Sequence, residues 1–68
     1  METPRALQDL DLAGLIGLPV ERARAVVEAT GGVLRAVAPG TAVTLEYRAD
    51  RVTVLVVNGE VIETGGIG

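Results

Sequence analysis

The chain has 68 residues, with nine acidic side chains against six arginines, no lysine, and a formal net charge of −3. It contains neither cysteine nor histidine, which removes disulfides, thiolate chemistry, the commonest general base and the commonest metal ligand. A chain this short builds one small core and has little room for a cleft. We therefore expect a binding module rather than an enzyme, with no cofactor and no metal.

Charge and hydropathy also indicate which classes of partner are not expected. The arginines are spread along the chain among acids and Tyr47 is the single aromatic residue, so we expect no nucleic-acid binding. Apolar runs fall well short of the roughly 18 residues of a membrane span, so we expect no membrane association. Residues 1–11 lack the pattern of a signal peptide. The chain is therefore expected to be cytoplasmic, or secreted with its signal removed, and the sequence leaves both open.

The N-terminal half predicts an arm followed by a helix. Residues 1–11 carry scattered leucines and are expected to form a flexible arm, and residues 12–68 a single domain. Pro19 suits the first turn of a helix because its missing N–H would have no partner there, and Gly31 with Gly32 ends the pattern. Apolar residues recur at helical spacing on one face of this helix: Val20, Ala23, Val26 and Val27.

The C-terminal half predicts strands. Val33–Val37 is short and rich in β-branched residues, and Arg51–Val57 is almost continuously apolar, as in a strand buried on both faces. Asn58-Gly59 is a strong hairpin signal because both residue types tolerate positive φ. Val61–Thr64 would then be the return strand, and residues 65–68 would be flexible unless something pins them.

The segment between the strands, residues 38–50, is ambiguous. Alternation of Thr41, Val43, Leu45 and Tyr47 with polar residues favours another strand, with Leu45 and Tyr47 on a core face. The competing interpretation is an extended, exposed loop that follows Pro39-Gly40. Residue pattern alone favours the strand.

This same segment carries a resemblance to a known family. Residues 40–52 read G-T-A-V-T-L-E-Y-R-A-D-R-V, which is similar to the reactive-site segment of the potato inhibitor I family of serine protease inhibitors. Leu15-Ile16-Gly17, the helix, the strand and the final Ile67-Gly68 follow in the family's order, so the resemblance covers about residues 12–68. Bacterial inhibitors with a segment of the type M-D-Y-R-P-D-R-L are also similar, although they commonly carry cysteines.

The resemblance implies an α+β fold: one helix packed on a small mixed β-sheet, with a long exposed reactive-site loop between two parallel strands. It implies a reversible, substrate-like inhibitor that presents Leu45-Glu46 as the scissile bond, with Leu45 in the primary specificity pocket. The residues expected to contact the protease are Val43, Thr44, Leu45, Glu46, Tyr47 and Arg48. Arg48 is equally well explained as a solvated charge.

The resemblance also implies how the loop is supported. In the family, the threonine and the acid beside the scissile bond, here Thr44 and Glu46, bond to arginines of the adjacent strand. Arg51 matches one of these arginines, but Thr53 stands where a second is common, so half of this support is expected to be missing. Gly68 is expected to prop the loop from below. A second departure is Leu12 in place of the family's tryptophan, which predicts an aliphatic core.

The expected partners are serine proteases of the subtilisin or chymotrypsin type, because leucine suits deep apolar pockets and a trypsin-type pocket with a buried acid rejects it. We expect a monomer. The alternative is a binding domain of the same fold that contacts a partner other than a protease.

Overall fold

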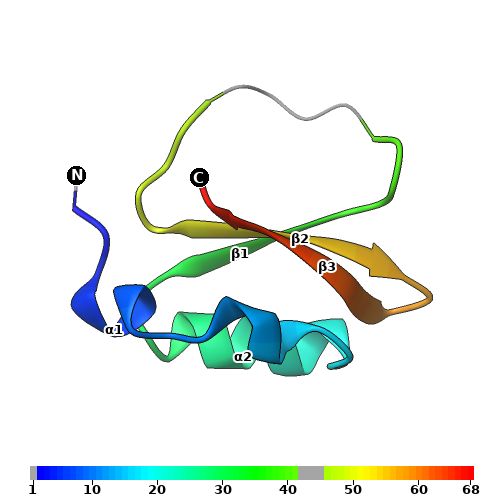
Figure 1. The fold of residues 1–68 in the computed structure, drawn as a ribbon, viewed down its shortest axis with the longest axis horizontal. Coiled ribbons are helices and arrows are strands. Elements are labelled where there is room, and N and C mark those ends of the chain that lie inside the picture. The colour runs from blue at the N-terminus through cyan, green and yellow to red at the C-terminus, as the bar shows by residue number, and fades with distance from the viewer. Residues whose placement is uncertain (1, 42–45) are drawn as a thin grey trace.

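The computed structural model describes residues 2–41 and 46–68. The elements in chain order are the short helix α1 (Arg5–Gln8), the 3-10 helix η1 (Leu12–Leu15), the helix α2 (Val20–Glu28) and the strands β1 (Val33–Val37), β2 (Arg51–Val57) and β3 (Glu60–Ile67). The sheet order is β1-β2-β3, with β1 parallel and β3 antiparallel to β2. The helices pack beneath the sheet, and the described residues between β1 and β2, 38–41 and 46–50, lie away from the helices (Figure 1). The predicted α+β fold is confirmed.

Helix α2 buries the predicted apolar face. Ala23 and Val27 are fully buried, and Val20 and Val26 pack against the core from its edge. The helix starts directly after Pro19. Beyond its C-terminus, Gly31 takes a φ of +88°, a backbone conformation that costs glycine little and other residues more.

The hairpin between β2 and β3 forms at the predicted turn. Asn58 and Gly59 have φ values of 52° and 78°, and positive φ at both central residues is the requirement of the tight turn that matches strand twist. The return strand is longer than Val61–Thr64, because Gly66 pairs with Thr53 and Ile67 with Val52. The C-terminal tail is thus pinned to β2 by the sheet itself.

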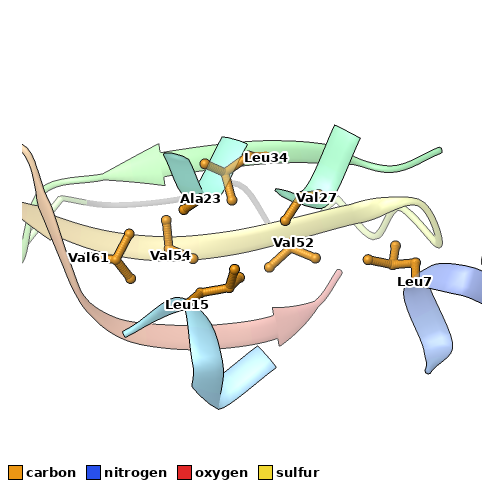
Figure 2. Close-up of a cluster of buried hydrophobic side chains, with 8 residues drawn as sticks. All are labelled: Leu7, Leu15, Ala23, Val27, Leu34, Val52, Val54 and Val61. Carbon is orange, nitrogen blue, oxygen red and sulfur yellow. The ribbon is translucent and has the colours of Figure 1, made fainter. Parts of the chain in front are cut away.

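The core is aliphatic, as the missing tryptophan predicts. Figure 2 shows its buried side chains, which come from both sheet and helices: Leu7, Leu15, Ala23, Val27, Leu34, Val52, Val54 and Val61. Leu12 packs against this cluster from its edge. Leu7 is only 1% exposed, so the segment expected to be a flexible arm contributes a helical turn and a core residue. The scattered leucines of residues 1–11 show no periodicity that would have indicated this contact.

The connection between β1 and β2 joins two parallel strands. Parallel neighbours need a crossover that returns the chain along the whole strand length, and this crossover is usually a helix. Here the crossover is residues 38–50, whose described parts are neither helix nor strand. Residues 38–41 and 46–50 lie on the side of the sheet away from α2 (Figure 1).

Candidate functional site

The connection of residues 38–50, called the loop below, contains the predicted reactive site. Val43, Thr44 and Leu45 lie outside the described residues. Glu46 is exposed, and Tyr47 is 68% exposed rather than turned to the core. The described part of the loop therefore agrees with the exposed-loop interpretation and not with an additional core strand.

Arg51, at the start of β2, joins the loop to the C-terminal tail. Its Nη2 donates a hydrogen bond of 2.7 Å to the main-chain oxygen of Glu46, and its Nε donates one of 3.0 Å to the main-chain oxygen of Gly68. The N–H of Gly68 in turn donates to the main-chain oxygen of Arg51 at 2.7 Å. A rigid guanidinium with donors on two sides suits this bridge, because one side chain orients two backbone segments at once.

The acceptor in the loop differs from the predicted one. The resemblance implied that Arg51 holds the carboxylate of Glu46 and the hydroxyl of Thr44; Thr44 lies outside the described residues. Within the part of the chain that the structure describes, the Glu46 carboxylate forms no ion pair, and Arg51 binds the main-chain oxygen instead. The backbone of residue 46 is in reach of the sheet while its side chain is exposed to solvent.

Tyr47 lies against the tail. A Cβ placed on Gly68 would be 3.6 Å from Cδ2 of Tyr47, which is ordinary van der Waals contact, so the ring edge packs beside the last residue. Tyr47 therefore lies next to the C-terminal residue, and most of its surface is open to solvent.

Arg48 is paired within the loop. Its Nε and Nη2 donate to the two carboxylate oxygens of Asp50 at 3.1 and 3.0 Å, the two-pronged geometry in which arginine binds a carboxylate best. Between them Ala49 is buried, and the N–H of Arg51 lies 3.4 Å from the main-chain oxygen of Arg48. The Arg48 side chain is still 40% exposed, so this ion pair does not decide between a solvated charge and a protease contact. A contact with a protease stays a prediction.

Thr53 has a partner that the sequence did not indicate. It pairs across the parallel strands with Arg35 of β1, and its Oγ1 accepts a hydrogen bond of 3.0 Å from Nε of Arg35. The pairing register between β1 and β2 brings these residues together. That register depends on how the loop closes, and no local motif in the sequence reports it.

The described residues contain neither a metal-binding cluster nor a membrane-spanning helix. Among them no group of three or more Asp, Glu, His or Cys side chains is placed to hold a metal ion. In the same residues, no helix is long and apolar enough to cross a membrane.

Comparisons with known proteins indicate the family to which the chain is similar. A model of the peptidase inhibitor I78 family matches residues 8–64. Among solved structures, the chain is similar to the bitter gourd trypsin inhibitor, with 31% sequence identity and a TM-score of 0.71 over 81% of this chain and 85% of that chain. A search of curated proteins finds no match. The prediction of a protease inhibitor is confirmed at this level.

Proposed function

This chain belongs to the peptidase inhibitor I78 family, and we propose that it is a reversible, substrate-like inhibitor of serine endopeptidases in the manner of the potato inhibitor I family. In this proposal the loop enters the protease cleft as a substrate would, with Leu45-Glu46 as the scissile bond. Val43, Thr44, Tyr47 and Arg48 contact the enzyme on either side of that bond.

The observation that carries the proposal is the bridge made by Arg51. A substrate-like inhibitor must bind well and yet be hydrolysed slowly. The hydrogen bond from Arg51 to the main-chain oxygen of Glu46 orders the loop before binding, so less conformational entropy is lost in the complex. The same arginine binds Gly68, which directly follows β3. The loop is therefore held in place by hydrogen bonds to the sheet and not by a disulfide.

The same bridge disfavours release after cleavage. Hydrolysis of Leu45-Glu46 would create a new amine at Glu46, whose own carbonyl oxygen is held 2.7 Å from Arg51. The amine then stays close to the acyl group on the enzyme, and a tethered nucleophile reacts at a far higher effective concentration than a free one. Religation therefore competes with release.

The specificity rests on residue 45. The similar bitter gourd protein is a trypsin inhibitor, and a trypsin-type pocket selects a basic side chain through a buried acid. Leu45 is apolar and branched, which suits the deep apolar pockets of chymotrypsin-like and subtilisin-like enzymes. We propose these two classes as targets, and a monomer as the inhibitory form.

Inhibition constants with subtilisin, chymotrypsin and trypsin test the proposal. We expect wild-type protein to inhibit the first two at least about a hundredfold better than trypsin, a difference of about 2.7 kcal/mol. Leu45→Arg should move the preference towards trypsin. Ala25→Arg, which adds the same charge on the exposed side of α2, is the matched control and should leave all three constants unchanged.

Two results would contradict the proposal. Equal constants for wild type and Leu45→Arg with every enzyme would show that residue 45 is not the specificity residue. No inhibition of any protease by a folded wild-type protein would favour the alternative, a domain of this fold that binds another kind of partner.

A further inference from the structure

The sheet has a side that faces the loop, and polar residues of both parallel strands lie on it. Val52 and Val54 are fully buried against the helices and Leu34 is 8% exposed on the same side. Because side chains alternate along a strand, Arg51 and Thr53 of β2 and Arg35 of β1 lie on the opposite side. The contact of Arg51 with Glu46 identifies this as the side under the loop.

Arg35 is held in a defined position on that side. Its Nε donates to the hydroxyl of Thr53 at 3.0 Å, and these two residues are direct partners in the parallel register. A hydroxyl fixes the plane of the guanidinium but does not neutralise its charge, and among the described residues the side-chain hydrogen bond of Arg35 is the one from Nε to Thr53. Among the described residues, the ion pairs are Arg24 with Glu21 and Arg48 with Asp50, so Arg35 has no carboxylate partner there.

Glu46 provides the complementary charge. Its carboxylate is exposed and has no ionic partner in the described part of the chain, while its main chain is held above the sheet by Arg51. Val33, the register partner of Arg51, lies two residues before Arg35 in β1. The two arginines are thus diagonal neighbours on adjacent strands, a separation across which long side chains interact.

We propose that Arg35 is the second loop-supporting arginine of this protein, a positioning residue that acts on the loop at Glu46 and is itself oriented by Thr53. The inference rests on the proposed inhibitory function and adds a residue to it. The second arginine expected two residues after Arg51 is absent from β2, and the threonine at that position holds a guanidinium supplied by β1 instead. The support predicted to be half missing is therefore complete, with one arginine from each parallel strand.

The experiment compares Arg35→Met with the matched control Arg22→Met. Both remove one arginine and keep an unbranched side chain, and Arg22 is exposed on α2. With subtilisin, we expect Arg35→Met to weaken inhibition about tenfold and to speed hydrolysis of Leu45-Glu46, and Arg22→Met to change neither. Thr53→Val keeps the shape of the side chain but removes the hydroxyl, and should give a smaller change in the same direction.

Moving the arginine from residue 35 to residue 53 distinguishes an effect on loop position from an effect on overall stability. The double variant Arg35→Met with Thr53→Arg moves the guanidinium from β1 to β2, and we expect it to recover most of the lost inhibition. Inhibition by Arg35→Met within about twofold of wild type would overturn the inference. The inference would also be overturned if Arg35→Met lost inhibition only in proportion to its lost thermal stability and if the double variant with Thr53→Arg did not recover that inhibition.

A second measurement does not depend on inhibition. Amide hydrogen exchange at Glu46 and Tyr47 in the free protein should be faster in Arg35→Met than in Arg22→Met, because the loop loses a support. Equal exchange in the two variants would overturn the inference. If wild type inhibits no protease but this difference in exchange is found, the proposed function fails and Arg35 is still established as a loop support.

Discussion

The two sides of the sheet differ in the kind of interaction that holds them. On the helix side, Val52, Val54 and Val27 are fully buried and contribute through apolar area removed from water. On the loop side, Arg51, Arg35 and Thr53 are half-buried and contribute directed hydrogen bonds to backbone and hydroxyl groups. Burial of this kind dominates folding free energy, whereas partly exposed polar contacts contribute little to it.

We therefore expect stability and loop geometry to respond to different substitutions in this protein. Losing a core methyl group leaves a cavity in a small core and lowers the free energy of unfolding. Losing an arginine on the loop side leaves the core intact and changes how well the loop is ordered. Three variants test this separation.

The largest expected effect is on the helix side. Val54→Ala removes two methyl groups from a side chain that is 0% exposed, and we expect the free energy of unfolding to fall by about 2–3 kcal/mol. Inhibition by the protein that remains folded should change little. Thermal and denaturant unfolding measure the loss of stability. Inhibition constants measured well below the melting temperature show whether the folded protein still inhibits. Val57→Ala, at an exposed position of the same strand, is the control and should stay within about 0.5 kcal/mol of wild type.

Gly32→Ala is expected to affect both stability and inhibition, because Gly32 lies between the core residue Leu7 and the loop residue Asp50. A Cβ on Gly32 would lie 2.9 Å from the main-chain oxygen of Asp50 and 3.0 Å from Cδ2 of Leu7. The backbone must shift, at a cost of about 1–3 kcal/mol in unfolding free energy. Because Asp50 is the last residue of the loop, inhibition should weaken as well.

The control is Gly14→Ala, whose Cβ has 4.0 Å of clearance and which should leave inhibition unchanged. Wild-type stability of Gly32→Ala would contradict the close approach of Gly32 to Asp50 and Leu7.

The smallest effect on stability is expected for Arg51→Ala. Its contacts are partly exposed, so unfolding free energy should fall by no more than about 1 kcal/mol. Inhibition should weaken about tenfold and cleavage at Leu45-Glu46 should accelerate, since about 1.4 kcal/mol of lost ordering is a tenfold loss of affinity. The check is an inhibition constant and a cleavage rate measured beside a melting curve. If the melting temperature falls as for Val54→Ala while inhibition is unchanged, the separation of the two sides is wrong.

Local patterns in the sequence determined the regular elements of the fold. Helical spacing of apolar residues indicated α2, a β-branched apolar run indicated β2, and Asn58-Gly59 indicated the hairpin. These features depend on periodicity and on backbone conformations that neighbouring residues set among themselves. Local patterns did not predict that the segment between β1 and β2 is a loop. Its alternation favours a strand, and the resemblance to an inhibitor family was needed to predict a loop.

Contacts between residues from distant parts of the chain could not be predicted from local patterns and became visible in the folded structure. It brought Leu7 into the core, extended β3 through Ile67, turned Arg51 to the main-chain oxygen of Glu46, and joined Arg35 to Thr53. Each of these contacts depends on strand register or on the closure of the chain around the sheet. Register is set by the packing of whole strands, and a shift of one residue would turn Arg35 to the other face. A linear sequence holds the residues for such contacts, but their pairing follows from the free energy of the assembled fold.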